Sequence, residues 1–231
     1  MKKKVFHLHI RKTSGTVLFR GLLNEYGKDS VLPYRSDLEI FGKFPDQESR
    51  EREVSKVSVI SGHFYKFAQE VPQDYVRVTI LRNPVERTIS AFNHMKSDRL
   101  DPKHVEIADL SFADAMNDAR FAHELWNGQT RALVAASGEN FEKLDDAGRV
   151  NTALHTLKKM ELVGFQENLE PFYKKLRTNL QIQIDYDERV NHKITSKGAR
   201  LADVINCSGA LALKNRLDIV VYFESLKIGC L

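Results

Sequence analysis

The 231-residue sequence holds only two cysteines and no long apolar run. Two cysteines are too few for a disulfide framework, so a reducing compartment is the default expectation. No stretch approaches the roughly 20 apolar residues that cross a membrane. Met1 precedes three lysines, as at the start of a signal peptide, but two histidines and two basic residues between positions 7 and 12 interrupt the apolar segment that would have to follow. We therefore expect a soluble, cytoplasmic protein.

The sequence also lacks a large excess of charge of one sign. The 35 basic and 31 acidic side chains leave a formal net charge of +4. That charge suits an anionic small ligand or an acidic acceptor, but it is too weak to indicate nucleic-acid binding. With 42% hydrophobic residues, the length suits one domain over residues 1–231 with a substantial core. Within it, we expect the charged range 37–56 to be a surface excursion that has room for a short helix.

Short apolar segments alternate with helical patterns along the chain. Period-two alternation and short apolar runs predict strands at 5–10, 57–60, 75–81 and 161–165. Helical periodicity and end signals predict helices at 17–26, from Asn83–Pro84 onward, over 112–157 with breaks at Gly128 and Gly138, at 167–180 and at 209–227. A short extended piece is expected at 182–186. This alternation favours an α/β fold with a mainly parallel sheet of about four to five strands.

The first predicted strand, loop and helix make a candidate anion site. Backbone N–H groups at a helix N-terminus have no partner within the helix, and the helix dipole adds a favourable potential. Gly15 lets a phosphate approach the backbone, and Lys12 adds positive charge. Hydroxyl groups come from Thr13, Ser14 and Thr16. A tight turn with a surface lysine is the competing interpretation, and the loop alone does not choose between the two.

The order of residues in this loop disfavours an ordinary kinase or ATPase. The P-loop of those enzymes reads G-x-x-x-x-G-K-[ST], with the lysine after the glycines. Here Lys12 precedes Gly15, and the first glycine of the pattern is missing. A small-molecule kinase remains an alternative, because Thr13 supplies a hydroxyl of the kind that helps to hold Mg²⁺.

A second motif follows the strand predicted at 75–81. Arg82 stands at the C-terminal end of that strand, where open parallel sheets bind their ligands. Ser90 lies eight residues later, in the following helix. A guanidinium and a hydroxyl at this separation can hold one phosphate from two sides. The competing interpretation pairs Arg82 with a carboxylate such as Glu86.

Together, the two motifs resemble those of the sulfotransferase superfamily. Its members carry a K-T-[GS]-[GS]-T loop for a 5′-phosphosulfate, and an Arg with a Ser eight residues later for the 3′-phosphate of 3′-phosphoadenosine-5′-phosphosulfate (PAPS). Lys12–Thr16 resembles the loop, and Arg82 with Ser90 resembles the pair. Further segments are similar to those of the glycan-type members, in the same order: Phe6–Ile10, Leu81–Phe92, Asn127–Arg131, Leu162–Phe165 with Glu167, and the helix with Asn215, Asp218 and Tyr222.

The resemblance implies a P-loop-NTPase-like sulfotransferase fold and a PAPS-dependent enzyme without a metal. The sulfuryl group would pass to a hydroxyl, with an amine less favoured, of a glycan or another polar acceptor, and adenosine 3′,5′-bisphosphate would leave. Nucleotide binding would fall to Lys12, Thr13, Ser14, Gly15, Thr16, Val17, Arg82, Ser90, Lys197 and Gly198. The chain departs from the family pattern in three places: Arg11 replaces a proline, Ser14 replaces a glycine, and Val17 replaces a hydroxyl residue.

The resemblance also suggests the catalytic groups. Lys12 would stabilise the leaving phosphate. His63, in a Gly-His segment similar to one in glycan sulfotransferases, is our candidate base, with His94 and Glu25 as rivals. His7 and His9 are expected to be strand residues. We interpret Asn215, Asp218 and Tyr222 as a structural polar cluster. A non-catalytic module that binds only nucleotide or a partner is a further alternative, which the departures at Ser14 and Val17 keep open.

Overall fold

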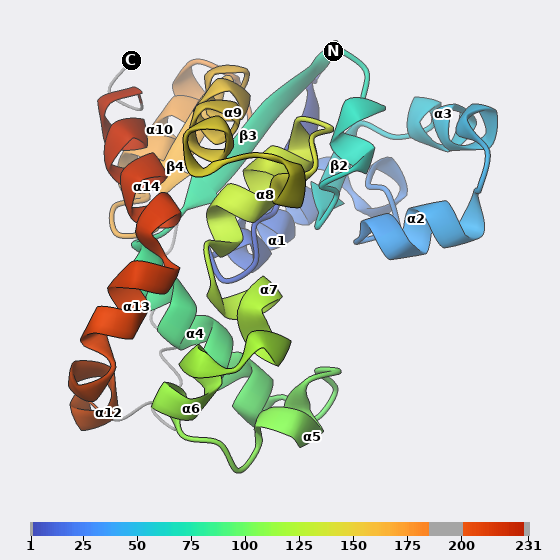
Figure 1. Cartoon of the computed structure of the whole chain (residues 1–231). Coiled ribbons are helices and arrows are strands. Elements are labelled where there is room, and N and C mark those ends of the chain that lie inside the picture. Colours follow the sequence, from blue (N-terminus) through green and yellow to red (C-terminus); the bar gives the residue numbers. More distant parts are fainter. Residues whose placement is uncertain (1, 185–200, 229–231) are drawn as a thin grey trace.

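A four-stranded parallel sheet forms the centre of the computed structural model, which describes residues 2–184 and 201–228 (Figure 1). Its strands are β1 (Lys4–Leu8), β2 (Val59–Gly62), β3 (Tyr75–Leu81) and β4 (Leu162–Phe165). They lie in the order β2-β1-β3-β4, and each neighbouring pair is parallel. His7 of β1 stands opposite Ser61 of β2 and Val78 of β3. The α/β fold and the parallel sheet predicted from the sequence are confirmed.

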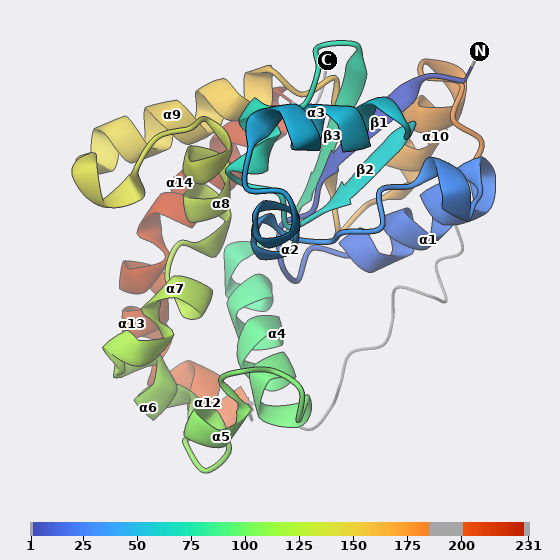
Figure 2. The same cartoon turned by 90° about the vertical axis from the view of Figure 1, so that its right-hand side faces the viewer.

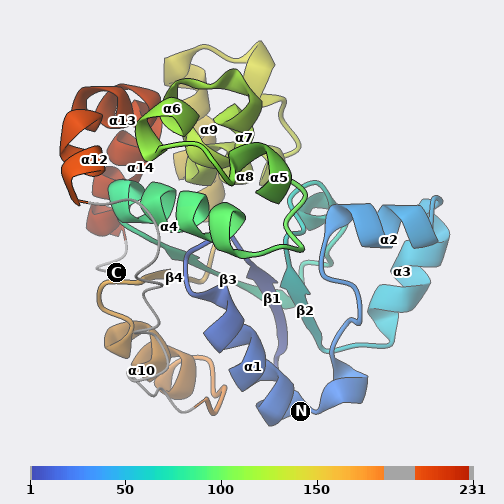
Figure 3. The same ribbon diagram turned by 90° about the horizontal axis from the view of Figure 1, so that it is seen from below.

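Helices cover both faces of the sheet, because successive side chains of a strand point to opposite sides. Val5 packs in a cluster with α1 (Gly15–Tyr26) and α10 (Glu170–Thr178), whereas Phe6 and Leu8 pack in the cluster of the other face. That other face is covered by α8 (Gly128–Ala136), α9 (Asp146–Lys158) and α14 (Arg216–Ile228) (Figure 3). By the same alternation, His7 and His9 project toward the α1 side.

A helical lobe lies beyond the C-terminal ends of the strands (Figure 2). It consists of α4 (Pro84–Ser97), α5 (His104–Ile107), α6 (Phe112–Asn117), α7 (Ala122–Leu125), α12 (Leu201–Asn206) and α13 (Ser208–Lys214), and has a cluster of its own around Phe92 and Phe112. The predicted start of α4 is confirmed, with Pro84 in the first turn and the Asn83 side chain accepting from the Val85 N–H at 3.0 Å. Single 3₁₀ turns occur at Lys28–Ser30, Phe67–Gln69, Ala119–Phe121 and Phe141–Lys143.

The charged range 37–56 forms two helices, α2 (Asp37–Lys43) and α3 (Gln47–Ser55). Ile40 and Val54 belong to the main core. Arg50 is buried although it stands within the run of charges, and its Nε donates to Glu70 at 2.6 Å. The range therefore packs against the domain more closely than its composition indicates.

Two helix boundaries differ from those predicted. Gly128 begins α8 instead of ending a helix, whereas Gly138 does follow one. The single helix predicted at 209–227 is divided into α13 and α14 at Asn215, whose side chain is drawn into hydrogen bonds with Thr88 and the Asn127 N–H. Of the predicted piece at 182–186, residues 185 and 186 lie outside the described residues. Within the described ranges, no helix combines the length and apolar character needed to cross a bilayer.

Candidate functional site

The loop between β1 and α1 carries two ordinary residues in the left-handed backbone region. Lys12 has φ 69° and Ser14 has φ 67°, a region that non-glycine residues seldom occupy. Ser14 is the N-cap of α1, and its side chain forms no capping hydrogen bond. Thr13 is buried, and its hydroxyl donates to the Ile10 carbonyl at 2.8 Å. The hydroxyl of Thr13 therefore stabilises the loop by an internal hydrogen bond, whereas Ser14 is partly exposed and Thr16 is exposed.

Gly15 is required by a close approach of a histidine ring. A Cβ atom at this position would lie 2.0 Å from Cδ2 of His9. His9 is buried at the end of the β1 segment, on the side that faces α1. The first turn of α1 can therefore lie against the end of β1 only because position 15 has no side chain.

Lys12 is one of two cations in this loop, and the other, Arg11, is paired with Asp101 at 3.1 Å. The Nζ of Lys12 forms no hydrogen bond or ion pair with any other described residue. Burial, followed by the positive charges of Arg11 and Arg82, lowers the pKa of Lys12 from its usual value. An anion placed here would regain the interactions that burial removes from this ammonium group.

One cavity of about 460 Å³ brings most of the predicted site residues together. Its wall includes Lys12, Ser14, Gly15, Thr16, His63, Arg82 and Ser90. Two predicted residues, Thr13 and Val17, stand in the same loop and helix but are not part of that wall. Lys197 and Gly198 lie outside the described residues. Five residues of the loop and first turn (Arg11, Lys12, Ser14, Gly15 and Thr16) and the Arg82–Ser90 pair, separate in sequence, thus face one cavity at the C-terminal edge of the sheet.

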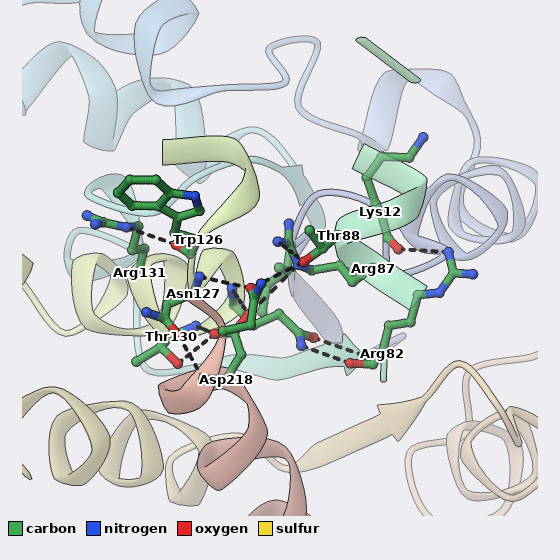
Figure 4. A network of polar contacts seen from close by, with 12 residues as sticks. Lys12, Arg82, Arg87, Thr88, Trp126, Asn127, Thr130, Arg131 and Asp218 are labelled. Atoms are coloured by element: carbon green, nitrogen blue, oxygen red, sulfur yellow. Dashed lines mark hydrogen bonds and ion pairs between the residues drawn. The ribbon is translucent and has the colours of Figure 1, made fainter. Parts of the chain in front are cut away.

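Arg82 is held at the end of β3 by both its main chain and its side chain. The Gln129 side-chain amide accepts from the Arg82 N–H at 2.9 Å and donates to the Arg82 carbonyl at 2.8 Å. The guanidinium donates to the Lys12 carbonyl at 3.4 Å (Figure 4) and to Glu86 at 3.3 Å. Its buried Nε has no hydrogen-bond partner. The pairing with Glu86 considered from the sequence does occur.

His63 follows β2 and is oriented by the main chain of β1. Its Nδ1 lies 2.7 Å from the carbonyl oxygen of His9. Because a carbonyl only accepts, Nδ1 must carry the hydrogen, which leaves Nε2 able to take a proton. Tyr65 lies beside the same two groups, with its hydroxyl 3.3 Å from the His9 carbonyl and 3.4 Å from His63 Nδ1.

The three histidines near the loop remain neutral at ordinary pH. Burial lowers the pKa of His7 to about 3 and, opposed by the hydrogen bond to His9, that of His63 to about 4. Burial also lowers the pKa of His9 well below its usual value. The rings of His9 and His63 stack with centroids 4.5 Å apart. His9, expected from the sequence to be a strand residue only, lies in the cavity wall. The alternation in 5–10 could have indicated it, because it places His9 on the α1 side.

The rival bases differ in position. His94 lines the cavity, and its Nε2 lies 3.7 Å from Asp98 and 3.9 Å from Asp101. Glu25 forms an ion pair with Lys2 at 2.8 Å near the far end of α1, so it is not part of the cavity. Gln166, which follows β4, lines the cavity as well, and no sequence signal pointed to it.

A buried polar network is connected through Gln129 to Arg82 of the cavity wall (Figure 4). Asp218 accepts from the Thr130 N–H at 2.7 Å and from the Gln129 N–H at 3.1 Å. Arg87, with only 3% of its side chain exposed, lies 3.8 Å from the fully buried Asp218 carboxylate. Asn215 accepts from the Thr88 hydroxyl at 3.2 Å. These contacts agree with a structural role for Asn215 and Asp218, and they add Arg87, which the sequence analysis had not singled out.

Comparison with known proteins identifies the family. A model of the sulfotransferase family matches residues 1–197. The crystal structure of a sulfotransferase from Alicyclobacillus acidocaldarius is similar with a TM-score of 0.54, at 16% identity, over 96% of this chain and 97% of that chain. No protein with a curated description matches. In the described parts of the chain, no group of three His, Cys, Asp or Glu side chains is placed to hold a metal ion. The family match takes in β1 to β4 together with the Lys12 loop and the Arg82–Ser90 pair, and the chain therefore belongs to the sulfotransferase family.

Proposed function

We propose that the chain transfers a sulfuryl group from PAPS to the hydroxyl of an acceptor. The observation that carries the proposal is the single cavity of about 460 Å³ that joins the Lys12 loop to the Arg82–Ser90 pair. PAPS carries one phosphate on the 5′ oxygen and one on the 3′ oxygen of its ribose. The cavity offers Lys12 for the first and Arg82 for the second. The resemblance of both motifs to those of known sulfotransferases supports the same assignment.

The residues of the cavity fit such a nucleotide. The N–H groups at the start of α1 and the free Lys12 ammonium suit the 5′-phosphosulfate. Arg82 and the Ser90 hydroxyl, both in the wall of the cavity, suit the 3′-phosphate. When bound, PAPS supplies an activated sulfuryl group on a good leaving group. Lys12 then stabilises the negative charge that grows on the bridging phosphate oxygen.

The proposed reaction is an in-line displacement in which His63 acts as the base. The acceptor oxygen forms a bond to sulfur while the bond between sulfur and the bridging phosphate oxygen breaks, and its electron pair leaves with adenosine 3′,5′-bisphosphate. The acceptor proton passes to Nε2 of His63. The hydrogen bond from His63 Nδ1 to the His9 carbonyl, 2.7 Å long, holds the ring in the tautomer that this step requires.

A binding experiment with a matched nucleotide tests the proposal. Adenosine 3′,5′-bisphosphate should raise the melting temperature of the protein without Mg²⁺. ATP with Mg²⁺ should raise it less. A shift with ATP and Mg²⁺ but none with adenosine bisphosphate would instead indicate the kinase alternative. Transfer of labelled sulfate from PAPS to a panel of sugars, alcohols and amines then tests turnover. Nucleotide binding without any transfer would indicate the non-catalytic alternative.

A further inference from the structure

His9 is a buried histidine that the proposed reaction leaves unused. It lines the cavity of about 460 Å³, which also borders Lys12 and His63, although only 7% of the residue is exposed. Burial, followed by the two neighbouring histidines, lowers the pKa of His9 well below its usual value. The ring is therefore neutral at ordinary pH, with a hydrogen on one of its two nitrogens.

The His9 ring is fixed in place by its neighbours. It stacks on the rings of His7 and His63, with centroids 5.3 and 4.5 Å apart. A Cβ atom at position 15 would lie 2.0 Å from Cδ2 and 2.3 Å from Nε2 of His9. The edge of the ring that carries Nε2 is therefore turned toward the first residue of α1, and the dense packing leaves the ring little room to rotate.

The two ring nitrogens of His9 differ in their surroundings. Nδ1 is buried and has no hydrogen-bond partner. Nε2 also has no partner among the described residues, but it is not enclosed by protein atoms, so it faces the open space of the cavity. Because an unpaired donor inside a protein is rarer than an unpaired acceptor, we place the hydrogen on Nε2. A ligand in the cavity would therefore meet an N–H donor at this atom.

His9 lies where the sulfuryl group of PAPS is expected. The proposed function puts the 5′-phosphate at the N–H groups of the first turn of α1 and the acceptor at His63. The sulfuryl group is bonded to that phosphate and is attacked by the acceptor, so it lies between the two points. The His9 ring borders both, because it packs against Gly15 and stacks on His63. A sulfuryl oxygen is therefore the acceptor that we expect nearest to Nε2.

We propose that His9 donates a hydrogen bond from Nε2 to a sulfuryl oxygen of PAPS. The proposal rests on the proposed function and adds a contact that recognises the sulfuryl group itself, whereas Lys12 acts on the bridging oxygen and Arg82 on the 3′-phosphate. The contact is lost on transfer, because adenosine 3′,5′-bisphosphate has no sulfuryl group. His9 therefore makes the protein bind the co-substrate more tightly than the product.

The test compares the dissociation constants of PAPS and adenosine bisphosphate, measured without an acceptor, in the wild type and in His9→Phe. Phenylalanine keeps a flat ring for the stack but has no Nε2. A hydrogen bond to a charged group changes a dissociation constant by about ten- to a hundredfold. We expect His9→Phe to bind PAPS more weakly by about that factor and to bind adenosine bisphosphate as the wild type does.

Two further variants separate the hydrogen bond from a structural effect. His9→Gln places an amide N–H near the position of Nε2 and should restore most of the affinity for PAPS. His7→Phe is the control, because His7 is buried in the same stack but does not line the cavity. It should leave the ratio of the two dissociation constants unchanged. Should His9→Phe fail to fold, His9→Leu takes its place.

The ratio of the two dissociation constants distinguishes a contact from a structural role. Equal affinity of the wild type for both nucleotides would overturn the proposal, as would a His9→Phe variant that weakens both alike or neither. Loss of the same ratio in His7→Phe would overturn it too, because the effect would then come from the stack. All of these results leave the proposed function standing, whereas failure of the wild type to bind adenosine bisphosphate would overturn the proposed function itself.

Discussion

Asn127 and Asp218 each cap the helix of the other. The Asn127 side-chain oxygen accepts from the N–H groups of Leu217 and Asp218, at 3.0 and 3.2 Å, in the first turn of α14. The Asp218 carboxylate accepts from the N–H groups of Gln129 and Thr130 in the first turn of α8. This exchange fixes α8 against α14. Since the Gln129 side chain also holds the main chain of Arg82, it fixes the end of β3 as well.

Replacing Asp218 should destabilise the fold strongly. Asp218→Ala leaves the buried Arg87 guanidinium without its carboxylate and frees two N–H groups, and breaking a buried pair in this way costs about 3–5 kcal/mol. Urea unfolding measures the loss. Asp145→Ala is the control, since Asp145 caps α9 at the surface through one hydrogen bond to the Gly148 N–H, a contribution of about 1 kcal/mol. Equal losses in the two variants would contradict a special role for the buried network.

Lys12 should contribute to the chemical step more than to folding. Lys12→Met removes the one lysine that lines the 460 Å³ cavity, and the loss of a group that stabilises transition-state charge typically lowers kcat about 10²–10³-fold. Steady-state sulfate transfer measures the change. Lys43→Met, at an exposed position in α2, should leave kcat unchanged. A Lys12→Met enzyme with full kcat and only a raised KM would show that the lysine binds but does not catalyse.

His63→Ala should abolish turnover and spare nucleotide binding. The imidazole is the proposed proton acceptor, whereas the residues proposed to bind the phosphates lie in the loop before α1 and at Arg82. Sulfate transfer and the melting shift with adenosine bisphosphate are measured side by side. His155→Ala, at an exposed position in α9, is the control. If His63→Ala turns over normally, His63 is not the base, and His94, which lines the same cavity, is the next residue to test.

The buried histidines predict that the free energy of unfolding falls in acid and changes little above about pH 6.5. In the folded protein the pKa is about 3 for His7 and about 4 for His63, below the usual 6.5, so the unfolded chain binds more protons between these values. Stability is therefore complete above about pH 6.5 and falls as the pH drops toward 4, by up to about 1.4 kcal/mol per pH unit for each histidine. Urea midpoints from pH 8 to pH 4 measure this fall.

The same pKa values set the pH dependence of kcat/KM, which reports groups of the free enzyme. We expect no decline of kcat/KM near pH 6.5, because His63 stays neutral down to about pH 4. A half-maximal rate near pH 6.5 would mean that the base is a histidine with an ordinary pKa.

Ser14→Gly should stabilise the protein. Ser14 has φ 67°, and a non-glycine residue in this region costs of order 1 kcal/mol, which glycine avoids. Ser49→Gly, inside α3, should instead destabilise by about 0.5–1 kcal/mol. Urea midpoints of both variants measure the change in the free energy of unfolding. A loss of stability in Ser14→Gly would show that interactions of the serine hydroxyl outweigh the cost of its backbone conformation.

Much of the fold could be predicted from local pattern. Alternation in β1 and β3, and the Asn83–Pro84 start of α4, depend on neighbours along the chain, and both were correct. The spacing of Arg82 and Ser90 likewise follows from one strand end and one helix. The division between α13 and α14 could not be predicted, because it depends on contacts of Asn215 with Thr88 and Asn127, which are distant in sequence.

The same distinction applies to the candidate site. Arg87 stands on a helix where a charged side chain would ordinarily point to solvent, and only the folded chain places Asp218 beside it. The left-handed conformations of Lys12 and Ser14 could not be predicted from the sequence either, since neither residue type indicates a positive φ. The sequence thus indicated several of the residues that meet in the cavity, but not His9 or Gln166, and not the contacts that hold the wall in place.

The single glycine of the anion loop relieves crowding rather than a backbone angle. Gly15 makes room for the His9 ring, while the left-handed positions carry a lysine and a serine. Chains with such side chains have fewer conformations in the unfolded state than glycine-rich ones. Ordering this loop therefore costs less conformational entropy than ordering a glycine-rich loop, so the proposed binding of a phosphate there would lose less affinity to the ordering of the chain.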